Sequence, residues 1–343
     1  MGYELRTQVV EPKRHTYSHL IERFGDKPAS RYQEASFDIQ PTENFHYRPT
    51  WDQTHALYDP DYTALKLTDP YNYTDPRQYY YTPYIANSAA RYDSFAETLK
   101  YIEERRLLDR LPEGWQLALT GFVVPLRHYE SGAQLISVNA SRFAWGTTVE
   151  QPASFAGFDR IGNAQLLSLI GLSISGGAGD TLTEAKKNWL HSGPLQPLRR
   201  LVEELLVEPD WAVGLVALDI VDSQLYQTLY THLDDRALFR GAMAYSLLAR
   251  HFSNWYANHH QWLVALIKAW TGDATHGDSN RKVLADIADR WYPAACDAMR
   301  SITHGVAEQA GSVTVVAAAD RAAAESAAEL AKVGITLTKG AAL

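Results

Sequence analysis

Residues 244–255 read AYSLLARHFSNW, and this stretch indicates the fold class of the chain. Its apolar residues recur at spacings of three and four, which is the period of one face of an α-helix. One such face collects an upstream leucine and four residues of the stretch: Leu238, Tyr245, Leu248, Phe252 and Trp255. We therefore predict a helix here that packs this face into the interior of a helical body.

The same stretch also bears on metal binding. Helical bundles hold di-iron centres with paired E-x-x-H motifs, because positions i and i+3 project from one face of a helix. Here Leu248 stands three residues before His251, so the acid is missing, and a leucine cannot bind iron. A further D-x-x-H, DATH at 273–276, falls in a predicted turn next to glycines. We predict no metal-ligating, catalytic or cofactor-binding residue in this chain.

Helical periodicity of this kind starts at Ser94 and continues along the chain. Residues 94–302 contain several long segments that are apolar on more than one side, and no repeat period relates them. Such helices are covered by neighbours over most of their circumference, so this body should be a multi-helix bundle and not a solenoid. Pro125 should kink one of its helices.

The last part of the chain, residues 303–343, differs from the body and should form a small appendage or contact tail. SVTVVAAAD at 312–320 favours a short strand. RAAAESAAELAKVG at 321–334 favours an alanine-rich helix, because alanine has the highest helix propensity.

The first 93 residues form a third part, an irregular arm that holds 13 of the 20 tyrosines and 8 of the 15 prolines. Disordered linkers are poor in aromatic residues, so a segment this rich in tyrosine should be ordered against a surface. Composition leaves two surfaces open: the chain's own helical body, or another subunit, whose interfaces favour aromatic and arginine side chains.

Two pairs in the arm have the spacing of metal ligands: Glu43 with His46, and Asp52 with His55. Both spacings need a helix to bring the two side chains to one ion. Prolines at positions 41, 49 and 60 disfavour helical backbone in this stretch. We therefore interpret the two pairs as accidental, and expect Glu43 and His46 to make separate contacts.

Composition excludes several classes of protein. The formal net charge is −8, with 32 basic against 40 acidic residues, so a nucleic-acid partner is not expected. The single cysteine, Cys296, allows no internal disulfide and fits a reducing compartment. No apolar signal region follows Met1, and the longest apolar runs are far shorter than the roughly 20 residues of a membrane span. We expect a cytoplasmic, soluble protein that neither binds nor crosses a membrane.

Three histidine and glycine motifs favour structural roles. His259 and His260 are adjacent and should point about 100° apart on a helix, which suits surface or contact roles. His128 could bond a buried carboxylate such as Glu130. The G-x-G of SISGGAGDTL at 173–182 lacks a βαβ context and should be a loop between helices.

Three stretches of the arm give a resemblance to a known family: VEPKRHTYSHLIERFGDKPASRYQEASFDI at 10–39, NFHYRPTWD at 44–52 and DPRQYYY at 75–81. They resemble the β subunit of the hydroxylase of bacterial multicomponent monooxygenases, and are most similar to the phenol hydroxylase group. PLRHYESGAQ, FDRIG and VEPDW in the body are similar as well.

The resemblance implies a ferritin-like, ribonucleotide-reductase-like bundle without iron ligands, in which Leu248 and His251 mark a vestige of the lost site. It implies an (αβγ)2 assembly whose α subunit carries the di-iron centre, together with a γ subunit. It also implies that the arm extends over the α subunit. The arm residues expected at this interface are Arg31, Tyr32, His46, Tyr47, Arg48 and Trp51.

The function implied is that of a non-catalytic structural subunit in an NAD(P)H-dependent monooxygenase of the phenol 2-monooxygenase type. Electrons would come from a separate reductase with FAD and a [2Fe-2S] cluster, and a regulatory protein would also take part. Phenol, toluene, alkenes and alkanes remain open as substrates, since the pocket would lie in the α subunit. Two other classes stay open: a self-sufficient ferritin-like metalloenzyme with unusual ligands, and a stand-alone helical protein that binds an apolar ligand.

Overall fold

The computed structural model describes residues 17–41, 45, 47–310 and 315–337. Every regular element in these residues is helical, and none is a strand. The predicted all-α class is therefore confirmed.

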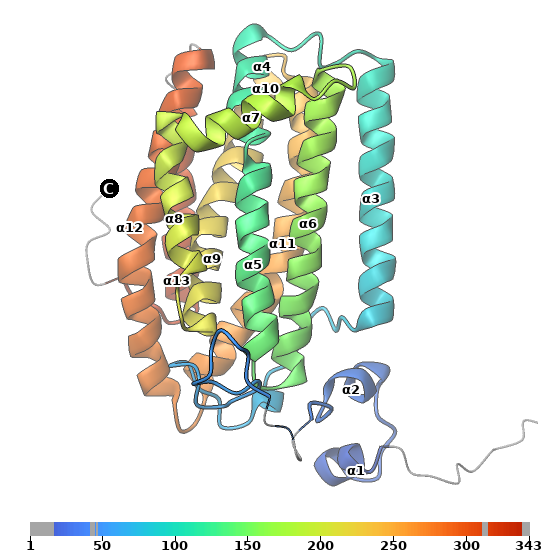
Figure 1. Ribbon diagram of the computed structural model, residues 1–343, viewed down its shortest axis with the longest axis vertical. Helices are drawn as coiled ribbons and strands as arrows, with labels where there is room; N and C mark the ends of the chain where they lie inside the picture. Colours follow the sequence, from blue (N-terminus) through green and yellow to red (C-terminus); the bar gives the residue numbers. More distant parts are fainter. Residues whose placement is uncertain (1–16, 42–44, 46, 311–314, 338–343) are drawn as a thin grey trace, which may run out of the picture.

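Long helices stand side by side and form the body of the molecule (Figure 1). They are α3 (Tyr81–Glu104), α5 (Leu126–Phe143), α6 (Thr147–Ile174), α9 (Trp211–Tyr226), α11 (Met243–Gly272), α12 (Gly277–Ala310) and α13 (Ala317–Lys332). Shorter elements connect and cap them: α4 (Glu113–Ala118), α7 (Asp180–His191), α8 (Gln196–Leu206), α10 (Leu233–Phe239) and the 3₁₀ turns η1 (Pro70–Asn72) and η3 (Gly193–Leu195). In the view of Figure 1, α5 and α6 lie in front of α11, and α3 stands apart at one side.

The tight turn between α5 and α6 sets the position of these two central helices. Gly146 has a φ of +93°, a conformation that favours glycine. A Cβ at this position would lie 2.3 Å from the Cβ of Pro70. The turn is thus closed on one side by a segment from the N-terminal part of the chain.

The core is rich in large aromatic side chains, which α11 and α12 supply. Trp255, Trp262 and Trp270 lie along one face of α11, and Trp291 lies on α12; all four are fully buried. Their spacing of seven and eight residues keeps the three indoles of α11 on the inward side. Because each indole buries roughly 200 Å² of surface, these residues contribute much of the hydrophobic stabilisation of the bundle.

Two π-helical turns interrupt the regular α-helical pattern. The first, η2 (Leu119–Val123), joins α4 to α5, and Pro125 stands directly before the first residue of α5. The predicted irregularity at Pro125 is thus confirmed, since proline lacks the N–H that would continue the helix. The second, η4 (Gln227–His232), joins α9 to α10.

Residues 61–80, which we call the strap, wrap one end of the bundle. The backbone of Lys66 exchanges two hydrogen bonds with the Asn280 side chain, of 3.0 and 2.7 Å. The backbone N–H and the hydroxyl of Thr68 both donate to the Asp273 carboxylate, at 2.7 and 2.8 Å. The strap therefore ties the N-terminal part of the chain to the turn between α11 and α12.

A carboxylate at the start of α9 holds the strap as well. Asp210 accepts hydrogen bonds from the N–H groups of Ala212 and Val213 and so caps the N-terminus of α9. Its other oxygen accepts the N–H of Ala64 at 2.7 Å. One side chain thus satisfies donors of the helix and of the strap together.

The helices α1 (Ser18–Phe24) and α2 (Arg31–Ser36) form a small unit beyond the end of the bundle (Figure 1). Their buried residues are Leu20, Tyr32 and Phe37, which pack with partly buried Phe24 and Tyr71. Ser30 and Gln33 form a capping box that fixes the start of α2. The unit has its own small core and meets the bundle through few side chains.

The three predicted parts do not end at helix boundaries. Helix α3 begins at Tyr81, so the limit at residue 93 falls inside it; Pro83 sits in the first turn, where its missing N–H costs no hydrogen bond. Helix α12 continues to Ala310, so the limit at residue 302 falls inside that helix. The limits at residues 93 and 302 thus lie within helices, and the division into three parts stays a prediction.

Two local predictions are wrong. The expected strand at 312–320 lies partly outside the described residues, and its remainder leads into α13, because alanines 317–319 and Asp320 favour the first turn of a helix. Leu238 does not share a helix with Trp255: it lies on α10, which ends at Phe239, and it is 58% exposed.

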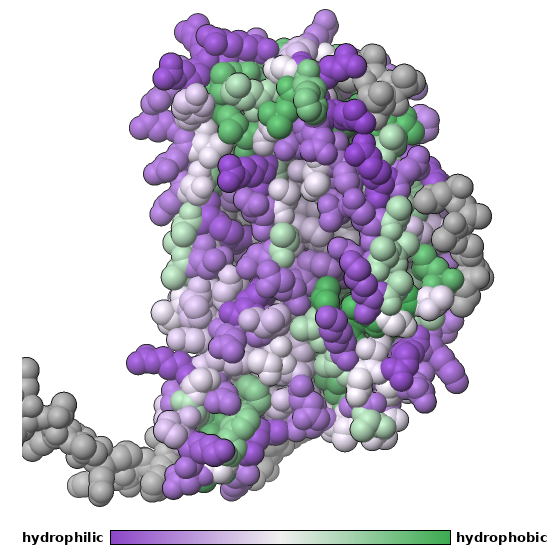
Figure 2. Space-filling model, turned by 180° about the vertical axis from the view of Figure 1, so that it is seen from behind, coloured by the Kyte–Doolittle hydropathy of each residue, from purple (hydrophilic) through white to green (hydrophobic). Residues whose placement is uncertain are grey.

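The end of the bundle that carries α10 is apolar at the surface. Leu238, Phe239 and Met243 are exposed there. Figure 2 shows hydrophobic side chains gathered at the corresponding upper end of the opposite face. None of the helices in the described ranges has the length and apolarity that crossing a bilayer requires.

Candidate functional site

The arm residues predicted at an interface fall into two groups. Arg31 is exposed at the start of α2, whereas Tyr32 is buried and its hydroxyl accepts the N–H of Asp75 at 3.1 Å. Tyr32 therefore belongs to the interior of its own chain, because the strap already covers its ring. Glu43 and His46 lie outside the described residues.

Tyr47, Arg48 and Trp51 form the second group, and all three are exposed. The indole of Trp51 is 69% exposed, yet it lies under the guanidinium of Arg142 from α5, with 4.6 Å between Cζ and the ring centroid. Arg48 donates to the carbonyl of Gln53 at 3.0 Å. The Arg142 contact thus holds Trp51 on the bundle, whereas the Arg48 bond stays within the arm.

The D-x-x-H pair of the arm makes a local contact. His55 Nδ1 lies 2.8 Å from Asp52 Oδ2, and the ring of His55 stacks on Tyr62 with centroids 3.7 Å apart. Thr54 also donates to Asp52. Among the described residues, no cluster of three or more histidine, cysteine or acidic side chains could hold a metal ion.

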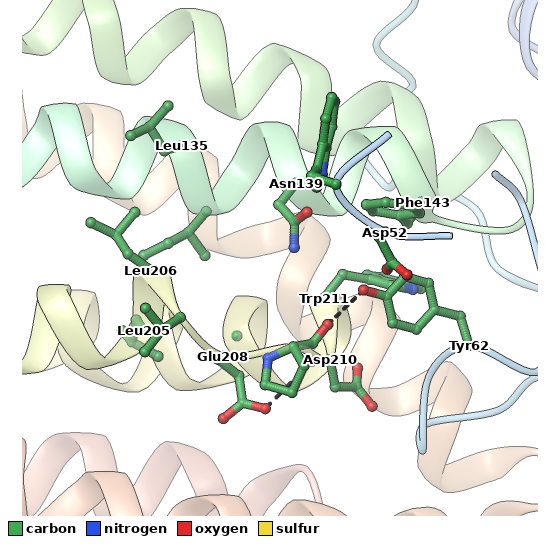
Figure 3. A pocket seen from close by; sticks show the side chains of 15 residues that line it. Asp52, Tyr62, Leu135, Asn139, Phe143, Leu205, Leu206, Glu208, Asp210 and Trp211 are labelled. Atoms are coloured by element: carbon green, nitrogen blue, oxygen red, sulfur yellow. Dashed lines mark hydrogen bonds between the residues drawn. The ribbon is translucent and has the colours of Figure 1, made fainter. Parts of the chain in front are cut away.

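A hollow of about 450 Å³ opens beside Trp51, where the arm, α5 and the start of α9 meet (Figure 3). Its wall includes Leu135, Asn139 and Phe143 of α5 and Leu206 of α8. The hydroxyl of Tyr62 donates to the carbonyl of Pro209 at 2.7 Å across its edge. The hollow thus joins arm and bundle into one continuous surface.

Exposed apolar side chains continue this surface over the bundle. We call it the α5–α6 face; it comprises Leu135, Val138, Phe158, Ile161, Leu206 and Val207, which are 41 to 78% exposed. A Cβ at Gly157 would lie 3.0 Å from Val138, so α5 and α6 approach closely behind the face. Several exposed apolar residues on neighbouring helices are typical of protein contact sites.

A buried ion network occupies the centre of the bundle. Arg160 of α6 is fully buried, and its Nη1 donates to Glu130 Oε2 of α5 at 3.2 Å. Its Nη2 donates to Asp222 Oδ2 of α9. Two carboxylates from two helices thus converge on one guanidinium from a third.

Two tyrosines complete the network. Tyr129 donates its hydroxyl to Asp222 Oδ1 at 2.7 Å, and Tyr226 donates to Glu130 Oε1. Burial raises the pKa of Glu130 and of Asp222 above their ordinary values, and the charge of Arg160 opposes this rise. All four carboxylate oxygens therefore have one hydrogen-bond donor each.

The helices that meet here match the layout of a di-iron bundle, but the side chains do not. Such a site takes one carboxylate from each of two helices and an acid–histidine pair at i and i+3 from each of the other two. Here α5 and α9 supply Glu130 and Asp222, while the i, i+3 pair of α6 is Arg160 and Asn163. Helix α11 contains no aspartate or glutamate at all and places Trp255 under Arg160, 4.7 Å from Cζ to the centroid. The residues present therefore do not fit a di-iron centre.

The predicted vestige at Leu248 and His251 lies elsewhere on α11. Leu248 is buried, and His251 faces α3, with its ring 4.9 Å from that of Phe95. Burial and the nearby charge of Arg91 lower the pKa of His251 to about 4. The carboxylates converge instead near Trp255, about one helical turn beyond His251 and two beyond Leu248, so the vestige that the resemblance implied does not coincide with this centre.

The other histidines also depart from prediction. His259 is buried, with its ring 4.7 Å from that of Trp255, and so has no surface role. His260 Nδ1 bonds Asp219 Oδ1 at 2.8 Å, which raises the pKa of His260 to about 9 despite the opposing effect of burial. His128 does not reach Glu130; it lies parallel to Trp189 at 6.2 Å.

Comparison with known proteins connects this architecture to a family. The family model described as Methane/Phenol/Alkene Hydroxylase matches residues 51–274. The chain belongs to this family. It is 38% identical to the phenol 2-monooxygenase oxygenase component DmpL of Pseudomonas sp. (strain CF600), over 98% of both chains.

A solved structure and a more distant relative extend the comparison. The phenol hydroxylase of Pseudomonas sp. OX1 has a chain that superposes with a TM-score of 0.89 at 39% identity, covering 98% of this hydroxylase chain and 99% of the other. The propane 2-monooxygenase small subunit of Mycolicibacterium goodii is 24% identical over 80% of this chain and 77% of the relative. The predicted ferritin-like bundle is confirmed. The chain is a subunit of a multicomponent monooxygenase hydroxylase and takes part in monooxygenase activity as one component of a complex.

The α5–α6 face and the ion network around Arg160 were not predicted from the sequence. The face had a signal: Leu135 with Val138 and Phe158 with Ile161 repeat at i, i+3 on helices that are already apolar on their other sides. The network had a weaker one, since an arginine and an aspartate inside largely apolar helices need buried partners.

Proposed function

We propose that this chain is the non-catalytic β subunit of a hydroxylase of the phenol 2-monooxygenase type. The observation that carries this proposal is the guanidinium of Arg160 between Glu130 and Asp222, where a metalloenzyme of this layout would hold its ions. An arginine stays protonated at any physiological pH and donates only, so it cannot ligate iron. The chain then contributes to activity by supporting the subunit that holds the iron.

The cofactors of the reaction accordingly belong to other chains. The di-iron centre would lie in the α subunit, and electrons from NAD(P)H would arrive through a reductase with FAD and a [2Fe-2S] cluster. A regulatory protein and a γ subunit would complete the system, in an (αβγ)2 hydroxylase. The naming of DmpL as one component of its enzyme supports such a division of labour.

The surface proposed to meet the α subunit combines the exposed arm residues with the α5–α6 face. Trp51 borders the hollow shared with Leu135 and Leu206. Tyr47 and Arg48 are exposed on the same segment of the arm. Aromatic and arginine side chains beside exposed aliphatic ones are the composition of interface cores. An obligate contact of this kind buries about 2,000 Å² or more.

The arm divides into two functional halves in this proposal. The strap lies on the chain's own bundle through Lys66 and Thr68, so its partner is already present. Residues 1–60 are proposed to extend over the α subunit. Of the two surfaces that composition left open, the strap would use only its own bundle. Residues 1–60 would use both, since Tyr32 and Trp51 also contact their own chain.

Phenol or a related aromatic compound is the proposed substrate class. The support is sequence identity. The chain shares 38% identity with the phenol 2-monooxygenase component DmpL over 98% of its length, and 24% with the propane 2-monooxygenase small subunit over 80%. The substrate pocket would lie in the α subunit, so the substrate class rests on relatedness.

Metal analysis of separate and assembled chains tests the proposal. The chain produced alone should retain no stoichiometric iron and oxidise no phenol. Produced together with the larger hydroxylase subunit, it should co-purify in a fixed ratio, with all the iron assigned to the partner. Two iron atoms per copy of the isolated chain, together with turnover, would contradict the proposal.

A further inference from the structure

We infer that the guanidinium of Arg160 takes the cation position of the bundle, and that its removal turns Glu130 and Asp222 into a divalent-cation site. The inference goes beyond the proposed subunit role, because that role requires only that the native chain holds no iron. It gives Arg160 a specific role: its guanidinium supplies the positive charge that Glu130 and Asp222 would otherwise need from a metal ion.

The first support is geometric. The two carboxylates come from α5 and α9, 92 positions apart in sequence, and reach the same guanidinium on different nitrogens. A planar guanidinium that binds two carboxylates keeps them within the short reach of its two Nη atoms. Carboxylates held this close and out of water are the ligand type that hard divalent cations prefer.

The second support is the hydrogen-bond arrangement. The outer oxygens of the two carboxylates are already oriented by Tyr129 and Tyr226. Ligating carboxylates in metal sites are oriented in this way by neighbouring donors. The inner oxygens, Glu130 Oε2 and Asp222 Oδ2, are the two that face Arg160, so they are the two that its removal would free.

The third support is electrostatic. All three charged groups are buried, with exposed side-chain fractions of 0 to 2%. Taking out the cation leaves two carboxylates without a counter-charge, which is strongly destabilising, whereas removing all three charges together can be nearly neutral. A divalent cation in the vacated space would supply the missing charge and recover part of the lost stability.

Thermal unfolding of the full chain, with and without Mn²⁺, tests the inference. In EDTA, Arg160→Ala should unfold about 5–10 °C below the wild type, because the two carboxylates are left uncompensated. Added Mn²⁺ should raise its midpoint by several degrees and leave about one Mn²⁺ per chain after gel filtration. The wild type should retain no Mn²⁺, and its midpoint should not respond.

Two further variants make the result specific. Arg160→Lys keeps a cation, so it should retain no Mn²⁺. The triple variant Arg160→Met, Glu130→Gln, Asp222→Asn removes every charge, and should fold with a midpoint above that of Arg160→Ala and without a response to Mn²⁺. Should Arg160→Ala fail to fold in EDTA, folding of the triple variant shows that charge and not lost volume explains the failure. Refolding of Arg160→Ala with Mn²⁺ but not without it would then support the inference, and no refolding in Mn²⁺ would contradict it.

Three results would overturn the inference. One is an Arg160→Ala midpoint equal to that of the wild type in EDTA. Another is that Mn²⁺ leaves the Arg160→Ala midpoint unchanged, or raises the midpoint of the triple variant by as much. The third is a triple variant as unstable as Arg160→Ala. None of them bears on co-purification with the α subunit, so the subunit role is judged separately.

Discussion

The guanidinium of Arg142 lies over the indole ring of Trp51, with 4.6 Å between Cζ and the ring centroid. Arg142 belongs to α5 and Trp51 to the arm, so this cation–π contact fastens the exposed part of the arm to the bundle. The ring nevertheless keeps 69% of its surface exposed. A held but uncovered aromatic side chain is suited to anchor a second protein.

Trp51→Ala should therefore weaken association with the α subunit by about 2 kcal/mol or more, roughly a 30-fold rise in Kd. The fold should persist, because Trp51 contributes little to the core. Sedimentation or calorimetric titration of the reassembled subunits measures the change. Tyr101→Ala, on an exposed aromatic residue of α3, serves as the control and should leave Kd unchanged. Equal effects of the two variants would refute a specific role for Trp51.

Deletion of residues 1–60 should leave helix content near normal and abolish assembly. The cut spares the strap, whose bonds to Asn280 and Asp273 close the end of the bundle. Circular dichroism and co-purification with the α subunit report the two outcomes. A deletion to residue 80 is the matched comparison: it removes buried Leu65 and Tyr73 and should destabilise the bundle itself. Normal assembly after the shorter deletion would show that the arm serves only its own chain.

His260 should make stability fall as pH rises. Its pKa is raised to about 9, chiefly by the Asp219 charge and hydrogen bond acting against burial. The protonated ring is thus favoured in the folded state, so its contribution is complete below about pH 6.5 and is lost as pH rises through 9, by up to about 3 kcal/mol. Urea unfolding at pH 6 and pH 9.5 should show this loss in the wild type and much less of it in His260→Gln. Parallel pH profiles of the two proteins would count against it.

His251, on the same helix, should act in the opposite direction. Its pKa is lowered to about 4 by burial and the Arg91 charge, so the neutral ring is favoured in the folded state. Its destabilising effect therefore appears only as pH falls below about 6.5 and grows toward pH 4. His251→Gln should flatten the acid limb of the profile and leave the alkaline limb intact. A variant that changes the alkaline limb instead would contradict this assignment.

Gly146→Ala should cost about 2–3 kcal/mol of unfolding free energy. The residue has a positive φ, and a Cβ there would overlap Pro70 of the strap. Chemical denaturation measures the loss. Gly179→Ala is the control, since a Cβ at that position meets nothing within 4 Å. A loss no greater than that of the control would mean that the strap yields easily at Pro70.

Helical periodicity predicted the bundle because it is a local property of each segment. The face formed by Tyr245, Leu248, Phe252 and Trp255 is indeed buried, since spacings of three and four reflect one side of a single helix. Leu238 broke the prediction because Gly241, with a positive φ, separates α10 from α11. The sequence shows Gly241, but it does not show that the preceding helix, α10, is short and ends at Phe239.

The ion network could not be predicted in the same way, because it depends on how three helices align. Glu130, Arg160 and Asp222 come together only when α5, α6 and α9 adopt one particular stagger. Sequence alone shows three charged residues in partly apolar surroundings, and each could have been paired elsewhere. The E-x-x-H motif likewise relates two positions on a single helix. It therefore indicated His251, whereas the buried ion network lies near Trp255.

The pairing of the strap with distant residues has a consequence for biosynthesis. Lys66 bonds Asn280, which lies 214 positions later in the sequence, and Thr68 bonds Asp273, which lies 205 positions later. Neither bond can form until these later residues have been synthesised. At ribosomal rates of roughly 5–20 residues per second, the strap leaves the exit tunnel about 10–40 s before its partners are made. Its aromatic side chains are thus exposed to chaperones during most of translation. The N-terminal arm can take its working position only after residues 273–280 have been synthesised, which places subunit recognition late in the life of the nascent polypeptide.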